Sequence, residues 1–232
     1  MGKAILLHGS NQIIEKPMLS SGKPHNDYGR GFYCTELDEM AKEWACKNQK
    51  DGFVNRYELD TKGLSCLNLS DGTHTVLNWI AILLKNRTFS LQSQVAIDAR
   101  EYMIEHFAPD TSTYDIIVGY RADDSYFRYA ESFLENTLPL GGLSKALVLG
   151  KLGLQTVLVS EKAFEGLNFI GAEPVDKTVY YPKFIERDNE ARRTYAEEIA
   201  KGKSYRDDIF VLDILREGMR NDDPRIQRIV FE

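Results

Sequence analysis

Short apolar runs and amphipathic helical patterns alternate irregularly along this 232-residue sequence, and this alternation constrains the fold more than any other feature. Patterns typical of strands cover residues 4–7, 31–35, 54–59, 64–69, 116–118, 155–160 and 167–170. Helical spacing covers residues 37–45, 73–86, 94–107, 125–134, 142–152, 184–200 and 209–219. Because the strands do not alternate regularly with helices, the pattern favours an α+β fold over a doubly wound sheet. No glycine-rich fingerprint follows a strand, which excludes a Rossmann platform.

The C-terminal third differs in composition from the rest of the chain. From residue 184 it is charged and rich in arginine, with Ala191, Tyr195 and Ile199 spaced four apart. We therefore predict one α+β domain over residues 1–181 and a helical extension, packed on it, over residues 182–232. The chain holds 29 Lys and Arg against 35 Asp and Glu, so it lacks the broad basic field that duplex nucleic acid binding usually needs. A small basic patch for a nucleic acid substrate is compatible with this charge.

Cysteines, histidines and the N-terminal residues indicate the compartment and argue against several kinds of site. The three cysteines form no CxxC pair and leave an odd count, which favours a reducing compartment: Cys34, Cys46 and Cys66. Three histidines show no metal-ligand spacing with one another or with the cysteines, so no metal is predicted: His25, His74 and His106. The apolar run 4–7 is too short for a signal peptide or a membrane span, and Leu6 stands where myristoylation needs Ser or Thr. We expect a cytoplasmic protein without a membrane partner.

A long loop and the strands on either side of it hold the candidate site. Structureless loops of about 20 residues in compact domains are usually binding loops or lids, and residues 11–30 are such a segment. The strand before it ends at His8-Gly9-Ser10, which predicts a turn there. After the loop, residues 27–35 read DYGRGFYCT, and Trp44 lies eleven residues after Tyr33.

These motifs together resemble the ADP-ribosyltransferase superfamily, in its diphtheria-toxin-like and poly(ADP-ribose) polymerase-like branch. That branch carries His-Gly-(Ser/Thr) on its first strand and Gly-x-Gly-(Ile/Phe)-Tyr on the next, with a second aromatic residue eleven positions later. The sequence is still more similar, over nearly its whole length, to an uncharacterised bacterial family of the same clan. The shared pieces are His8 to Ser10, Asp27 to Thr35, Ala41 to Ala45, Ala122 to Asp124, Gln155, and Arg187 to Arg192.

The resemblance implies a split pair of antiparallel sheets surrounded by helices, with NAD as the substrate and no metal. It implies that Gly9 offers its backbone to the nicotinamide carboxamide, that Tyr33 and Trp44 offer aromatic faces, and that His8 and Ser10 bind ribose hydroxyls. Nicotinamide is a flat cation with an amide, so aromatic faces and a backbone donor and acceptor suit it. Arg30, between two glycines, could pair with the pyrophosphate. We expect the His8 side chain near the Tyr33 ring, with both opening onto one cleft with Gln155.

Gln155 stands where the strong transferases of this superfamily have a glutamate. A hydrogen bond to the ribose 2′-hydroxyl that tightens in the transition state lowers the barrier to cleavage. A carboxamide can accept that bond but supplies no full negative charge, which argues against polymer synthesis. On sequence grounds, Gln155→Glu is expected to raise NAD cleavage by roughly one to three powers of ten.

Each of these residues also has a purely structural interpretation. Tyr33 and Trp44 could be core anchors, and Gln155 could be an exposed strand residue. Asp123 and Asp124 have the positions of a helix N-cap and first turn, although two carboxylates at a cleft could also orient an acceptor as general base. The arginines near residue 190 fit a solvated helix face: Arg187, Arg192 and Arg193.

The sequence therefore predicts a mono-ADP-ribosyltransferase-like enzyme with catalytic residues His8, Tyr33 and Gln155. It transfers one ADP-ribose from NAD to an acceptor, which could be a protein, a nucleic acid or a small molecule. An NAD glycohydrolase and a non-catalytic module that binds NAD or ADP-ribose are the alternatives. The resemblance also implies a toxin or conflict effector, with a neutralising protein as a further partner.

Overall fold

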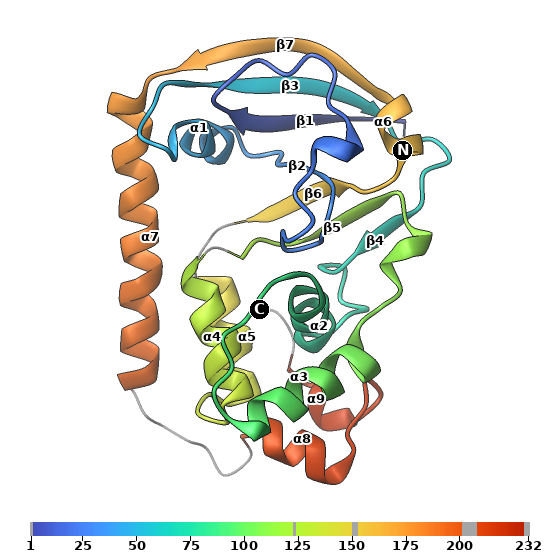
Figure 1. Ribbon diagram of the computed structural model, residues 1–232, viewed down its shortest axis with the longest axis vertical. Coiled ribbons are helices and arrows are strands. Elements are labelled where there is room, and N and C mark those ends of the chain that lie inside the picture. Colours follow the sequence, from blue (N-terminus) through green and yellow to red (C-terminus); the bar gives the residue numbers. More distant parts are fainter. Residues whose placement is uncertain (1, 123, 150–152, 201–207, 230–232) are drawn as a thin grey trace. The chain divides into compact units, whose positions relative to one another are not determined.

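The computed structural model describes residues 2–122, 124–149, 153–200 and 208–229 (Figure 1). The chain divides into two compact units, each built from three segments of the sequence. Unit 1 comprises residues 1–68, 111–121 and 152–189, and unit 2 comprises residues 69–110, 122–151 and 190–232. The contacts therefore do not divide the chain at residues 181 and 182, and the extension expected over 182–232 contributes to both units.

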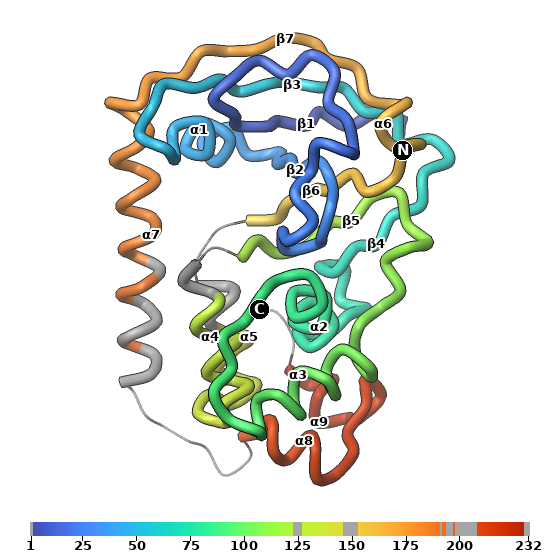
Figure 2. The backbone as a smooth tube through the Cα atoms, in the orientation of Figure 1, coloured from blue at the N-terminus to red at the C-terminus, as the bar shows by residue number. Residues whose placement is uncertain are grey.

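The first sheet of unit 1 is a three-stranded antiparallel sheet in the order β1-β3-β7 (Figure 2). Its strands are β1 (Lys3–Ser10), β3 (Gly52–Asp60) and β7 (Leu167–Val175). The turn expected at residues 8–10 is wrong, because His8, Gly9 and Ser10 continue β1 and pair with β3. Strand β7 runs five residues past its expected end, until Asp176 accepts a hydrogen bond from Thr178 N at 2.7 Å and the chain turns into a helix.

The second sheet of unit 1 has four strands in the order β2-β6-β5-β4. They are β2 (Phe32–Cys34), β6 (Leu154–Leu158), β5 (Ile116–Tyr120) and β4 (Cys66–Asn68). β4 runs parallel to β5 and the other pairs are antiparallel, so this sheet is mixed. Leu7 and Thr35 exchange two backbone hydrogen bonds, of 2.8 and 2.9 Å, and so join β1 to the end of β2. The predicted α+β fold with two sheets is confirmed.

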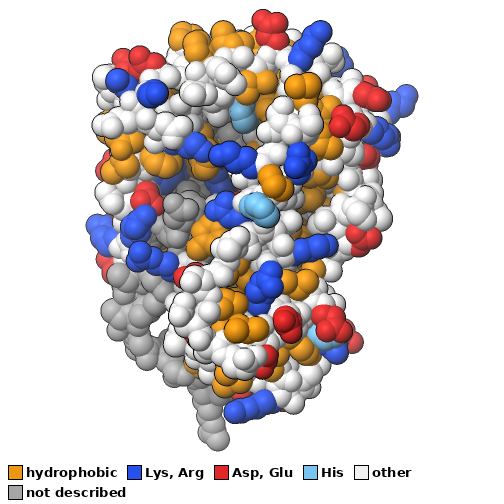
Figure 3. Space-filling model, viewed as in Figure 1, with side chains coloured by type: hydrophobic (Ala, Val, Ile, Leu, Met, Phe, Trp, Pro, Cys, Tyr) orange, Lys and Arg blue, Asp and Glu red, His pale blue; other side chains and the backbone are white. Residues whose placement is uncertain are grey.

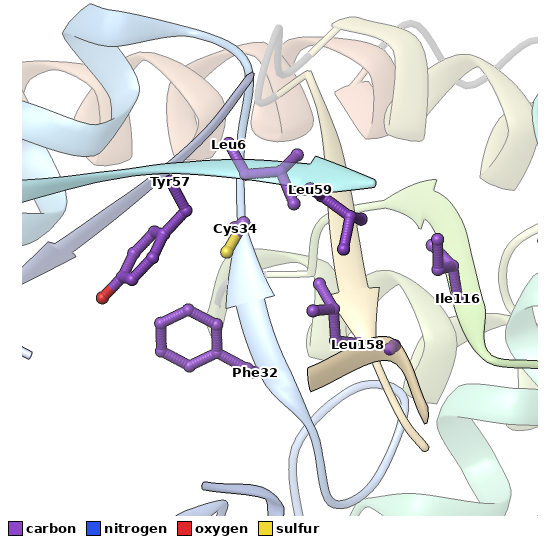
Figure 4. Packing of buried hydrophobic residues seen from close by; sticks show 8 residues of the cluster. Leu6, Phe32, Cys34, Tyr57, Leu59, Ile116 and Leu158 are labelled. Carbon is purple, nitrogen blue, oxygen red and sulfur yellow. The ribbon is translucent and has the colours of Figure 1, made fainter. Parts of the chain in front are cut away.

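One core cluster lies between strands of both sheets (Figure 4). Every other residue of a strand points to the same face, so β1 contributes Leu6 while β3 contributes Tyr57 and Leu59. β2 and β6 contribute Phe32 and Leu158. Full burial of side chains of this size stabilises a fold by about 1.5–3 kcal/mol each, which makes this cluster a main source of stability for unit 1.

Helix α1 (Asp38–Cys46) packs against the opposite face of β1 and β3 through small residues. Ala41, Ala45 and Cys46 are buried there with Leu7 and Val54. The alternative interpretation of Trp44 as a core anchor is wrong, since Trp44 is half-buried and absent from the cluster. Thr35 and Asp38 have the spacing of a capping box, but the Thr35 hydroxyl accepts from Leu37 N at 3.1 Å and Leu37 precedes the helix, so no such box forms.

The loop over residues 11–31 contains only a short 3₁₀ turn, η1 (Leu19–Ser21), and β3 fixes its beginning. The fully buried Asn55 side chain accepts from Ile14 N at 2.8 Å and donates to Gln12 O at 3.1 Å. The Tyr57 hydroxyl donates to Ile14 O at 2.5 Å. These contacts fix the start of the loop next to His8, whose position in β1 pairs with Asn55.

Unit 2 is helical in the part that the structure describes. Its helices are α2 (Val76–Asn86), α3 (Gln94–Phe107), α4 (Asp124–Leu134), α5 (Leu140–Leu149), α8 (Val211–Glu217) and α9 (Pro224–Gln227). α2 is the central helix, since its residues from Val76 to Leu84 are all buried, and a capping box of Thr75 and Asn78 starts it. Asn78 Nδ2 also donates to Phe107 O at 2.8 Å and ties α2 to the end of α3.

The long helix α7 (Lys177–Ala200) begins seven residues before the predicted start at residue 184. Within unit 1, Arg187 forms a two-pronged ion pair with the buried Glu43 of α1, with distances of 2.6 and 2.7 Å. Arg187 is therefore a docking residue of α7 rather than part of a solvated face. Among the described helices, none is long and apolar enough to cross a membrane.

The Asp115 side chain links the ends of β4, β5 and β6, and its titration is expected to make the free energy of unfolding depend on pH. Its carboxylate accepts from Ser65 N at 2.8 Å and from the Ser160 hydroxyl at 2.6 Å. These hydrogen bonds lower the pKa of Asp115 to about 2 from an ordinary value of 3.8. The stabilisation is therefore complete above about pH 4 and is lost as the pH falls towards 2.

Asp115→Asn is expected to lower the free energy of unfolding at pH 7 by roughly 1–2 kcal/mol, and by less at pH 3. Urea unfolding at both values measures the difference between variant and wild type. Glu36→Gln, at an exposed carboxylate, is the control. An Asp115→Asn effect that is equal at both pH values would contradict this role of the charge.

Candidate functional site

The edge of β1 offers a backbone donor and acceptor at Gly9. Residues of a strand direct their N–H and C=O alternately to the two sides, and Leu7 directs both of its groups away from β3, to Thr35. Gly9 lies two residues after Leu7, so its N–H and C=O also point away from β3. Thr35 does not reach them, because the pairing with the end of β2 involves only Leu7. Neither group has a hydrogen-bond partner among the described residues. A free donor and acceptor on one residue can bind an amide.

His8 lies beside this edge and contacts β2. Its Nδ1 is 2.7 Å from the carbonyl oxygen of Tyr33, so Nδ1 carries the proton and donates. Its ring stacks on Phe32, with centroids 4.4 Å apart. Burial lowers the pKa of His8, the positive charges of Lys47 and Arg121 lower it further, and the bond to Tyr33 opposes them. The histidine is therefore neutral at pH 7, and Nε2 can accept a hydrogen bond from a ligand hydroxyl.

The contacts that His8 makes in this region are with the Tyr33 backbone and the Phe32 ring. Phe32 and Tyr33 are neighbours in β2, so their side chains point to opposite faces of the sheet. Phe32 faces the core cluster that Figure 4 shows. Tyr33 faces away from it, and its hydroxyl donates to Gly29 O at 2.7 Å and accepts from Tyr28 N at 3.0 Å.

Gln155 lies on the same face of the sheet as Tyr33. Tyr33 pairs with Val157 of β6, and Gln155 precedes Val157 by two residues. The side chain is 4% exposed, and its Nε2 donates to Asp27 Oδ2 at 3.1 Å and to Tyr120 O at 3.3 Å. It is therefore a buried, hydrogen-bonded residue and not an exposed strand residue. The structure brings Tyr33 and Gln155 to one face, and both bind the segment 27–29.

Two cations lie over the ring of Trp44. The guanidinium carbon of Arg121 is 3.5 Å from the ring centroid and Lys47 Nζ is 4.1 Å from it. A Cβ at Gly9 would lie 3.0 Å from Trp44 Cβ, so the tryptophan begins next to the free edge of β1. Figure 3 shows Lys and Arg side chains gathered near a recessed histidine side chain on the face that it displays. Nicotinamide would compete with these cations for Trp44, whereas a pyrophosphate would be attracted to them.

Arg30 and Ser10 have local partners. Arg30 is exposed and its Nη1 donates to Ser20 O at 2.9 Å, within the loop. The Ser10 hydroxyl accepts from Gln12 N at 3.4 Å. Gly31, the second glycine of the Gly-Arg-Gly motif, touches β6, since a Cβ there would lie 2.6 Å from Val157 Cγ1. That glycine is explained by close packing of the loop end on β6.

Of the two acidic residues proposed for the acceptor side, Asp123 and Asp124, the structure describes one. Asp123 lies outside the described residues, and Asp124 is the first residue of α4, in agreement with its expected place in a helical first turn. Within the described ranges, no group of three His, Cys, Asp or Glu residues could hold a metal ion.

Sequence reasoning missed the roles of Asp27, Lys47 and Arg121. Lys47 follows Trp44 by three residues, which is a helical spacing that could have suggested contact. Arg121 precedes the Ala-Asp-Asp motif that drew attention to residues 122–124. Asp27 lies 128 residues from Gln155 in the sequence, so no local pattern could have joined them.

Comparison with known protein families gives a match to one family model. The family model described as "Protein of unknown function (DUF3990)" matches residues 4–169, a range that includes His8, Tyr33 and Gln155. No curated protein and no solved structure matches the chain. Since the family model covers well over half of the 232 residues, the chain belongs to the DUF3990 family.

Proposed function

We propose that this protein is a mono-ADP-ribosyltransferase-like enzyme that cleaves the nicotinamide–ribose bond of NAD and transfers one ADP-ribose unit. The observation that carries the proposal is the free N–H and C=O of Gly9 beside a neutral His8. The nicotinamide carboxamide has a carbonyl acceptor and an NH₂ donor, and a backbone N–H and C=O complement them. The sequence resemblance of His8 to Ser10 and of Asp27 to Thr35 supports the same chemistry.

Three further contacts are proposed for NAD. His8 Nε2 accepts a hydrogen bond from a ribose hydroxyl of the nicotinamide half, because its Nδ1 already donates to Tyr33 O. Arg121 and Lys47, which lower the pKa of His8 through their charges, attract the pyrophosphate. Gln155 Oε1 accepts from the 2′-hydroxyl of the ribose that reacts.

The proposed reaction breaks the bond between C1′ of ribose and the pyridinium nitrogen, and the bonding electrons leave with nicotinamide. A lone pair of the acceptor forms the new bond to C1′, and the acceptor's proton passes to solvent or to a base. The ribose is positively charged in between, so a hydrogen bond from its 2′-hydroxyl to Gln155 stabilises it. A neutral glutamine does this more weakly than a carboxylate, which fits transfer of one unit better than polymer synthesis.

Incubation of the purified protein with NAD tests the proposal. We expect free nicotinamide, detected by chromatography, and an added mass of one ADP-ribose on an acceptor supplied from a cell lysate or on the protein itself. Nicotinamide release without any added mass would instead identify an NAD glycohydrolase. Tight NAD binding in calorimetry with no nicotinamide after hours, lysate included, would contradict the enzyme and leave a binding module.

Two substitutions of Tyr33 are expected to separate its ring from its hydroxyl. Tyr33→Phe loses the bonds to Gly29 and Tyr28, at a cost to stability of about 1–2 kcal/mol, but keeps the ring. Tyr33→Ala also loses the face proposed to stack on nicotinamide, and is expected to weaken NAD binding about tenfold more than Tyr33→Phe does. Calorimetric titration with NAD measures both. Equal affinities of the two variants would show that the ring does not meet nicotinamide.

A further inference from the structure

We infer that Asp27 is a positioning residue for Gln155, and that its carboxylate strengthens the hydrogen bond that a neutral glutamine alone would accept only weakly. Asp27 holds the glutamine so that Oε1 faces the ribose hydroxyl, and its carboxylate polarises the amide from behind. This inference rests on the proposed function, since it assigns Gln155 Oε1 to the ribose of NAD.

The hydrogen bonds of Gln155 determine which end of its amide is turned to Asp27. The two groups nearest to the amide nitrogen are Asp27 Oδ2 at 3.1 Å and Tyr120 O at 3.3 Å, and both are acceptors when Asp27 is a carboxylate. Only the NH₂ end of the glutamine can donate to them, so the carbonyl end must point elsewhere. Oε1 has no hydrogen-bond partner among the described residues, although the residue is only 4% exposed. A buried acceptor without a partner is suited to a ligand hydroxyl.

Asp27 is held in place by its own neighbours. It is 7% exposed and belongs to the segment 27–29, which Tyr33 binds through Tyr28 N and Gly29 O. The Tyr28 hydroxyl donates to Tyr120 O at 2.8 Å, the same carbonyl that Gln155 approaches. β2, β5 and β6 thus all help to fix the carboxylate against the amide. Free rotation of Gln155 would break both of its bonds.

The position of Asp27 reverses the result expected for Gln155→Glu from the sequence. A glutamate at residue 155 would place a second carboxylate against Asp27 Oδ2 and an oxygen against Tyr120 O, where the amide now donates two hydrogen bonds. Two carboxylates at this distance repel each other or share a proton. The single substitution is therefore expected to lower NAD cleavage, and the gain should appear only when residue 27 becomes a donor.

The test compares Asp27→Asn, Gln155→Glu and the double variant Asp27→Asn/Gln155→Glu, with Glu36→Gln as an exposed control. Nicotinamide release from NAD gives kcat and KM, and thermal unfolding without NAD gives the midpoint of each protein. Asp27→Asn is expected to lower kcat by about ten- to a hundredfold with less than about a threefold change of KM, because the charge is lost while a hydrogen bond to Gln155 remains. The double variant is expected to have a kcat well above that of Gln155→Glu, because the amide introduced at position 27 can donate to the carboxylate introduced at position 155.

The outcomes separate this inference from the proposed function. A wild type that releases no nicotinamide overturns the proposed function and the inference with it. An active wild type with unchanged kcat in Asp27→Asn overturns only the inference, and so does a double variant that is no more active than Gln155→Glu. If the pair is merely structural, the double variant would recover the unfolding midpoint but not kcat. That result would also overturn the inference.

Discussion

Replacing His8 by asparagine is expected to lower nicotinamide release from NAD at least about a hundredfold while the protein stays folded. The side-chain nitrogen of asparagine can take the place of Nδ1 and donate to Tyr33 O, so the link between β1 and β2 is kept. The acceptor at Nε2 is lost, and with it the bond that we propose orients the ribose. Orientation errors are felt mainly at the barrier, so NAD affinity should change less than about tenfold. Steady-state kinetics and calorimetry measure the two quantities.

His8→Ala removes both contacts of the imidazole and should abolish turnover while some NAD binding persists. His25→Asn, at an exposed histidine of the loop, is the control and should behave as wild type. Equal losses of affinity and of turnover in His8→Asn would mean that His8 contributes to ground-state binding only. Unchanged turnover in both His8 variants would remove His8 from the site altogether.

The positions of helices and strands could be predicted from the sequence where the local spacing of apolar residues determines them. α3 occupies residues 94–107 as expected, since its apolar residues repeat at helical spacing between a serine cap and Phe107. β5 begins at Ile116 as expected, because a run of β-branched residues has few alternatives. Element ends were less predictable. The sequence alone predicted a turn at residues 8–10. Instead β1 continues through them, because these residues pair with β3.

The candidate site depends on strand register, which no local pattern contains. The pairing of Tyr33 with Val157 determines that Tyr33 and Gln155 share a face, and it joins residues 124 apart in the chain. The same alternation turns Phe32 rather than Tyr33 towards His8. Motifs could therefore identify the candidate residues, but their partners follow from tertiary pairing.

Trp44 shows how helical periodicity can select the wrong anchor. Leu37, Ala41 and Trp44 lie at helical spacing, a pattern that predicts packing of the large Trp44 side chain on the sheet. However, Leu37 is 49% exposed, and the buried face consists of Ala41, Ala45 and Cys46. Small residues are required because α1 lies close to the backbone of β1. The residue of β1 that permits this approach is Gly9, where an added Cβ would lie 2.0 Å from Ala41 O.

Gly9→Ala is therefore expected to lower the free energy of unfolding by about 3 kcal/mol or more. The atoms that the new methyl group would meet are the backbone oxygen of Ala41 and, at 2.7 Å, the backbone nitrogen of Ala45, so no side-chain rotation can relieve the contact. α1 would have to move away from β1 as a whole and would take Trp44 with it. The midpoint of thermal unfolding should fall by roughly 5–10 °C, which circular dichroism measures.

Gly2→Ala is the matched control, because Gly2 directly precedes β1 and a Cβ there would meet no atom within 4 Å. It should change stability by less than about 0.5 kcal/mol. The N–H and C=O of Gly9 lie on the strand edge while its Cβ would point at α1, so the folded fraction of Gly9→Ala keeps the donor and acceptor but has a displaced Trp44. We expect that fraction to bind NAD more weakly than wild type does. An unfolding midpoint equal to that of Gly2→Ala would contradict the close packing of α1 on β1, and with it the placement of Trp44 beside the free edge.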